Sequence, residues 1–93
     1  QREAELLATR IRSADNEGFR SGKMVAEASA VTGGHRIART EAEIRIVAQE
    51  AMNVSPYRPV QFHNWSGDEW SAWKDGFVAG YADYMRKRQR PAW

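Results

Sequence analysis

The chain contains no cysteine, only three prolines and no long hydrophobic run. The absence of cysteine excludes a disulfide framework, a thiolate zinc site and a cysteine nucleophile. No apolar stretch approaches the roughly 20 residues that a membrane-spanning helix needs, and no signal peptide is recognisable. We therefore expect a cytoplasmic protein without membrane contact. Because the chain opens on Gln1, we also expect a trimmed or processed product.

Charge of one sign is also scarce, because 14 Lys and Arg residues face 12 Asp and Glu residues, for a net charge of +2. Two net charges do not drive nucleic-acid binding by themselves. The 42% hydrophobic and 28% charged content is typical of a soluble globular protein. With 93 residues, the chain suffices for a single domain, residues 1–93, with one modest core.

The first predicted element is a helix over residues 2–31. Apolar or small residues recur there at alternating steps of three and four, which places them on one helical face. The first part of this row predicts packing against another helix, in the same chain or in a second copy, and comprises Ala4, Leu7, Ile11, Ala14 and Gly18. A turn near residues 15–18 is the alternative. The adjacent glycines at 33 and 34 predict the end of the helix.

Two capping boxes predict two further helices. Thr40 and Glu43 predict a helix that starts near residue 40 and ends by Ser55, because Pro56 disfavours helical geometry in the residue before it. Ser66 and Glu69 predict a helix over residues 66–90, and Pro91 marks its limit.

The stretch between these helices, residues 53–65, contains two prolines and several apolar side chains. Proline excludes a helix there, so we expect an extended strap, with a short edge strand at 60–62 as a further possibility. Trp65 and Trp70 occupy the positions of a hydrophobic staple around the last helix start. The predicted fold is mainly α: a small three-helix domain with a proline-containing strap between helices two and three.

A short motif occurs twice, at residues 17–22 and 75–80, with the pattern acid-Gly-Phe-x-x-Gly. Two glycines one turn apart remove side-chain bulk from one helical face and allow a close crossing. We therefore predict that both motifs lie at a helix crossing, with both phenylalanines largely buried; the residues concerned are Gly18, Phe19, Gly22, Gly76, Phe77 and Gly80. A degenerate internal duplication is the alternative origin of the pattern.

The order of three motifs resembles the ribosome modulation factor family: Gly-Phe-x-x-Gly at 18–22, Pro56-Tyr57, and Trp-x-x-Gly-Phe at 73–77. That family consists of small bacterial proteins that bind the ribosome in slow growth and promote its inactive dimer. Here the spacer between Gly22 and Pro56 is longer and contains an extra predicted helix. The resemblance implies binding to structured RNA or the ribosome, and hence a role in translation regulation.

No catalytic constellation is present in the sequence. His35 and His63 lack a carboxylate or histidine at helical spacing, which argues against a helical metal site. No serine lies in a Gly-x-Ser-x-Gly motif, and the adjacent glycines lack the lysine of a phosphate loop. We therefore expect a protein that is not an enzyme, with no cofactor, metal or small-molecule substrate.

The candidate nucleic-acid-binding residues are the basic cluster near the C-terminal end and two arginines before the second helix: Arg86, Lys87, Arg88, Arg90, Arg36 and Arg39. Such cations contact phosphates and make binding salt-dependent. The alternative is a solvated helix end whose cations complement the helix dipole.

A second set of residues is typical of a protein interface, since tryptophan and arginine are common interface anchors. It comprises Leu7, Ile11, Ala14, Trp65, Trp70 and Trp93. We predict a binding protein whose partner is structured RNA or the ribosome. The alternative is a phage-type protein-interaction module, meaning an inhibitor, an adaptor or a self-assembling structural protein. The low net charge and the aromatic C-terminal half favour this alternative.

Overall fold

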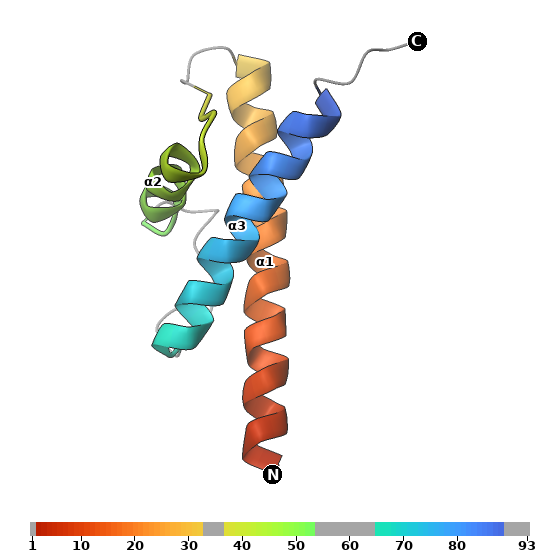
Figure 1. Cartoon of the computed structure of the whole chain (residues 1–93), viewed down its shortest axis with the longest axis vertical. Helices are drawn as coiled ribbons and strands as arrows, with labels where there is room; N and C mark the ends of the chain where they lie inside the picture. Colours follow the sequence, from red (N-terminus) through yellow and green to blue (C-terminus); the bar gives the residue numbers. More distant parts are fainter. Residues whose placement is uncertain (1, 33–36, 54–64, 89–93) are drawn as a thin grey trace.

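A computed structural model describes residues 2–32, 37–53 and 65–88. These residues form three helices and no strand: α1 spans Arg2–Thr32, α2 spans Glu41–Ala51 and α3 spans Gly67–Arg88 (Figure 1). The predicted mainly α, three-helix fold is confirmed. The adjacent glycines at 33 and 34, most of the predicted strap and the possible edge strand at 60–62 lie outside the described residues.

The first helix runs without interruption through residues 15–18, so the alternative of a turn there is wrong. At 1.5 Å per residue, its 31 residues correspond to a rod about 46 Å long. Such a helix depends on tertiary contacts along its length, because propensity alone stabilises it weakly.

Both predicted capping boxes are present. The Thr40 hydroxyl accepts a hydrogen bond from the Glu43 backbone amide at 3.2 Å, and the Glu43 carboxylate accepts one from the Thr40 amide. At the start of α3, the Glu69 carboxylate accepts from the Ser66 amide at 3.1 Å, and the Ser66 hydroxyl accepts from the Glu69 amide at 3.4 Å. These bonds satisfy amides that a helix start leaves without partners.

The two long helices, α1 and α3, run in the same direction and cross each other (Figure 1). Glycines of both helices lie at the closest approach. A Cβ atom built on Gly18 would overlap the carbonyl oxygen of Trp73. One turn further on, a Cβ atom on Gly22 would overlap the carbonyl oxygen of Phe77. Only glycine permits this approach of α1 to the backbone of α3.

The glycines of α3 make the reciprocal contacts. A Cβ atom on Gly76 would overlap the carbonyl oxygen of Asp15, and one on Gly80 would overlap that of Phe19. These approaches are close enough for Cα–H···O contacts, which recur at tightly packed helix pairs. The helix-packing role predicted for the four glycines is therefore confirmed.

These contacts relate the two helices by an approximate internal two-fold axis. Each residue of α1 corresponds to the residue of α3 whose number is higher by 58. Residue 18 thus corresponds to 76, and 15 to 73, so the contact 18–73 matches the contact 76–15. The pair 22–77 matches the pair 80–19 in the same way. The repeated sequence motif therefore produces a repeated contact.

The core lies on one side of this crossing, where α2 packs on α3, and Ala14 and Ala26 of α1 also belong to it. We call Trp70, Trp73, Phe77 and Tyr81 the aromatic ladder, in which neighbouring ring centroids are 6.2, 5.4 and 6.3 Å apart. Three of the four rings are fully buried, and α2 adds its buried face of Ile44, Ala48 and Ala51. The buried Nε1–H of Trp73 has no acceptor within the described residues, an exception that costs roughly 1–3 kcal/mol.

The two phenylalanines of the repeated motif differ in burial. Phe77 is 0% exposed, as predicted, but Phe19 is 36% exposed, so the prediction that Phe19 is largely buried is wrong. In the positions that correspond to Trp73 and Tyr81, α1 carries the charged residues Asp15 and Lys23. Those residues cannot form an apolar surface for another helix, and α2 packs on α3 instead.

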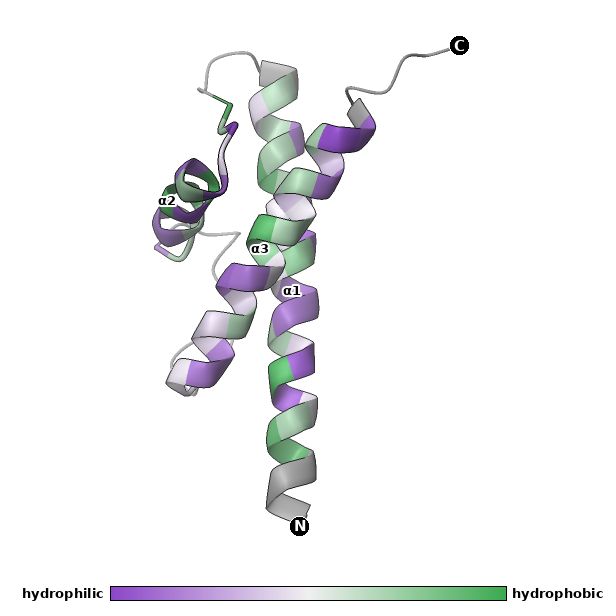
Figure 2. Ribbon diagram, in the orientation of Figure 1, coloured by the Kyte–Doolittle hydropathy of each residue, from purple (hydrophilic) through white to green (hydrophobic). Residues whose placement is uncertain are grey.

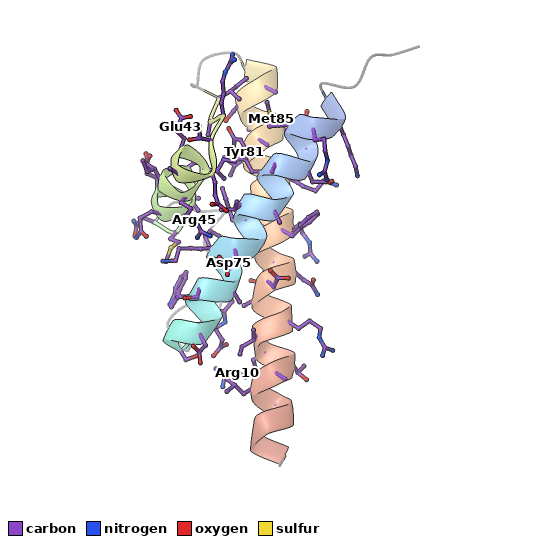
Figure 3. The ribbon with its side chains drawn as sticks, viewed as in Figure 1. Arg10, Glu43, Arg45, Asp75, Tyr81 and Met85 are labelled. Carbon is purple, nitrogen blue, oxygen red and sulfur yellow. The ribbon has the colours of Figure 1, made fainter. Side chains whose placement is uncertain are left out.

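Polar contacts fix the elements around α3. Arg45 of α2 and Asp75 of α3 point toward one another and form an ion pair of 3.1 Å (Figure 3). The Tyr81 hydroxyl accepts a buried hydrogen bond of 3.0 Å from the Ala38 amide, which ties the segment before α2 to α3.

The N-terminal end of α1 extends beyond the start of α3 (Figure 1). By the offset of 58, Gly67 is level with residue 9, so the preceding residues of α1 have no counterpart on α3. Leu6 and Leu7 there are 62% and 40% exposed, and Figure 2 shows hydrophobic stretches in this part of the helix. Ala14 and Gly18 pack within the chain, Ile11 is half-buried and Leu7 is exposed in the single chain, so packing of Leu7 against a second copy stays a prediction; the side chain of Ala4 is not described.

Candidate nucleic-acid interface

The predicted basic cluster begins on the last turns of α3. Arg86 and Lys87 are exposed there, but both pair with Asp83, at 2.8 and 3.2 Å. Hydrogen bonds from Arg86, then Lys87, hold the pKa of the Asp83 carboxyl below its ordinary value of 3.8. These two cations are therefore already partly neutralised within the helix.

The other predicted nucleic-acid-binding residues are not gathered beside these two in the described part of the chain. Arg39 is exposed in the segment before α2, where its amide donates a hydrogen bond to the Glu43 carboxylate. Arg36, Arg90 and the side chain of Arg88 lie outside the described residues. For these residues the sequence prediction stays a prediction.

Two further arginines hold the fold together. Arg10 bonds at 3.0 Å to Glu69, whose side chain is 1% exposed, and so links α1 to the start of α3. Arg45 joins α2 to Asp75 of α3, as described above. A ligand that bound either arginine would leave Glu69 or Asp75 without its ion-pair partner. For Glu69, which is buried, an unpaired charge costs much free energy.

The outer face of α1 carries three cations of a different kind. Arg12, Arg20 and Lys23 form no ion pair with any described residue, and we call them the α1 cation stripe. Their spacings of eight and three residues place them within one face of the helix. At 1.5 Å per residue, the stripe extends over about 16 Å.

Phe19 lies within this stripe. The Lys23 Nζ atom is 5.9 Å from the centroid of the Phe19 ring, in the range of a cation–π contact. Two exposed acids lie beside the cations of this stripe: Asp15 follows Arg12 by three residues, and Glu27 follows Lys23 by four. The face thus combines three cations, one partly exposed aromatic ring and the exposed Asp15 one turn before that ring.

Of the residues predicted for a protein interface, Ala14 is 1% exposed and faces α3, so it is not available to a partner. Trp65 and Trp70 are half-buried and pack edge to face, with ring centroids 5.0 Å apart, as the staple predicted. Leu7 remains exposed, Ile11 is half-buried, and Trp93 lies outside the described residues.

Sequence reasoning missed the α1 cation stripe and the buried Glu69. The spacing of Arg12, Arg20 and Lys23 was a signal, but acids intervene in the sequence and hide it. Glu69 was recognised as a capping residue, whereas its burial follows from Arg10, which is distant in sequence.

Among the described residues, no cluster of three or more His, Cys, Asp and Glu side chains is suited to hold a metal ion. Nor does the described part contain a helix with the length and apolarity required to cross a bilayer. Comparisons with protein-family models, curated proteins and solved structures find no match for this chain. The resemblance to the ribosome modulation factor family therefore rests on the sequence motifs alone.

Proposed function

We propose that this protein is a non-enzymatic RNA-binding protein that contacts the phosphate backbone through the outer face of α1. The observation that carries the proposal is that Arg12, Arg20 and Lys23 share one face and form no ion pair with a described residue. The ribosome, or another structured RNA, is the partner that the motif resemblance favours.

The availability of these cations is what distinguishes them. A cation that binds a phosphate releases counterions from the nucleic acid, and this release provides much of the affinity. Arg10, Arg45, Arg86 and Lys87 must first give up a carboxylate, so part of that gain is lost. The three residues of the α1 cation stripe bind without breaking an ion pair.

The test compares two variants with equal loss of charge. The first replaces the α1 cation stripe by glutamine (Arg12→Gln, Arg20→Gln, Lys23→Gln), and the second replaces Arg39, Arg86 and Lys87 in the same way. RNA affinity is measured as a function of salt concentration. Each lost contact to single-stranded RNA lowers the salt slope by about 0.7, so we expect a decrease of about two for the first variant.

We expect a smaller change for the second variant, because two of its cations are paired with Asp83. Equal salt curves for both variants and the wild-type protein would contradict RNA binding through α1. A loss confined to the second variant would return the site to the basic cluster predicted from the sequence.

One observation favours a protein-interaction module as a second candidate. Leu6 and Leu7 are 62% and 40% exposed on the part of α1 that extends beyond α3, and Leu7 continues the face that packs on α3. The variant Leu6→Glu/Leu7→Glu tests this candidate by size-exclusion chromatography with light scattering. A wild-type oligomer that the variant converts to a monomer supports it, and a monomer in both cases removes self-association.

A further inference from the structure

We infer that Phe19 is a stacking platform for an unpaired base, so that the α1 face recognises single-stranded or looped RNA rather than a continuous duplex. This inference rests on the proposed function, because it names the class of RNA that the same face binds.

The ring of Phe19 is partly open to solvent. Phe19 and Phe77 occupy equivalent positions in the repeated motif, but Phe19 is 36% exposed whereas Phe77 is 0% exposed. The crossing needs the backbone of Phe19, whose carbonyl group meets Gly80, and it leaves the ring at the surface. The ring is therefore not enclosed by the core, and part of it is open to a ligand.

Cations lie around the ring of Phe19. Arg12 lies two turns before Phe19 on the same side of α1, and Lys23 places its Nζ atom 5.9 Å from the ring centroid, while Arg20 is the next residue around the helix. An aromatic ring beside cations is the combination that single-strand binding proteins use, since the bases stack while the cations follow the backbone. In duplex RNA the bases are stacked on one another and are not available to the ring.

The contact between Lys23 and Phe19 suggests how the face changes on binding. In the free protein, the Lys23 ammonium group lies over the ring, where the cation–π attraction is modest at an exposed site. A base that stacks on Phe19 displaces this group, which then becomes free to contact the adjoining phosphate. The exchange replaces one weak contact by a stacking contact and a charge contact.

The test uses a mixed-sequence single strand of RNA and the same strand annealed to its complement. Wild-type protein is compared with Phe19→Leu, which keeps an apolar side chain, and Phe19→Tyr, which keeps the aromatic ring. Base stacking on an aromatic ring contributes about five- to hundredfold in affinity, so we expect Phe19→Leu to weaken single-strand binding by about tenfold. Phe19→Tyr should retain wild-type affinity, and duplex binding should be similar in all three proteins.

Ile46→Ala is the matched control, because Ile46 is another large apolar side chain, 61% exposed, and lies on α2 and not on the helix that carries the α1 cation stripe. It should leave single-strand binding unchanged, and unfolding in urea should show that all variants fold. Single-strand affinity that Phe19→Leu leaves unchanged, in a protein that loses binding when the stripe is neutralised, overturns the stacking inference alone. Failure of the wild-type protein to bind either RNA overturns the proposed function together with it.

Discussion

The two copies of the Gly-Phe-x-x-Gly motif share a backbone arrangement but have opposite surroundings. On the α3 side, Phe77 stacks between Trp73 and Tyr81 and is covered by the face of α2. On the α1 side, Phe19 has Asp15 and Lys23 at the equivalent positions and remains partly exposed. The glycines determine how the helices cross, and the residues one turn before and after each phenylalanine determine which side becomes core.

The side of the crossing around Phe77 of α3 is buried in the core, whereas the side around Phe19 of α1 is accessible from solvent. A symmetric pair with two aromatic faces would expose one of them, because the chain has only one α2 in its described part. Charged residues on the α1 side prevent that exposure and also direct α2 to α3. One of these residues, Lys23, also belongs to the α1 cation stripe of the proposed RNA-binding face.

Truncating the two phenylalanines should give the largest contrast. We expect Phe77→Ala to destabilise the protein by about 3–5 kcal/mol, because it removes a fully buried ring from the centre of the aromatic ladder. Phe19→Ala should cost less, about 1–2 kcal/mol, since its ring is partly exposed. Urea unfolding followed by circular dichroism measures both, and equal losses would contradict the asymmetry.

Adding a methyl group at the crossing should give the next largest effect. Gly80→Ala places a Cβ atom against the carbonyl oxygen of Phe19, so we expect a loss of about 1–3 kcal/mol from overpacking. Gly18→Ala should cost a similar amount, because the internal two-fold axis gives it the equivalent contact. Gly67→Ala is the control, since no atom lies within 4 Å of its Cβ position, and it should be neutral or stabilising.

Removing the Tyr81 hydroxyl group tests the hydrogen bond that it accepts from the Ala38 amide, on the side of α3 that α2 covers. Tyr81→Phe leaves the buried Ala38 amide without its acceptor, and we expect a loss of about 1–2 kcal/mol. Lys23→Met changes the equivalent position on α1 and should leave the free energy of unfolding nearly unchanged. A Tyr81→Phe variant as stable as the wild-type protein would show that the hydrogen bond contributes little.

The smallest effect concerns the end of α3 and depends on pH. The pKa of Asp83 is lower in the folded protein than its ordinary value of 3.8, so the carboxylate with Arg86 and Lys87 favours folding when ionised. This contribution is complete above the ordinary value and is lost as the pH falls through the lowered pKa. NMR titration of the Asp83 carboxyl should show the pKa rise in the variant Arg86→Gln/Lys87→Gln, and an unchanged titration would contradict the pairing.

The fold was largely predictable because its signals are local. The boxes at Thr40 and Ser66 indicate two helix starts, and glycines one turn apart indicate a close crossing whatever the partner helix. The exposure of Phe19 was not predictable in this way, because its motif and that of the buried Phe77 look alike in sequence. Their difference follows from the placement of α2, which is a tertiary property.

The candidate site was predictable only in part. Charge density points to residues 86–90, but density does not reveal which cations already have partners. Asp83 lies within one turn of Arg86 and Lys87, and this spacing was a usable sign of pairing. The engagement of Arg10 by Glu69 joins residues far apart in sequence and required the structure.

We propose that the uncovered side of the crossing, and not the end of α3, is the face that binds RNA. The most direct measurement is a titration of isotope-labelled protein with a single-stranded RNA, followed by the backbone amide NMR shifts. We expect the largest shifts at residues 12–23 of α1 and small shifts at α2 and the aromatic ladder. Shifts confined to residues 86–93, or no shifts near physiological salt, would contradict the claim.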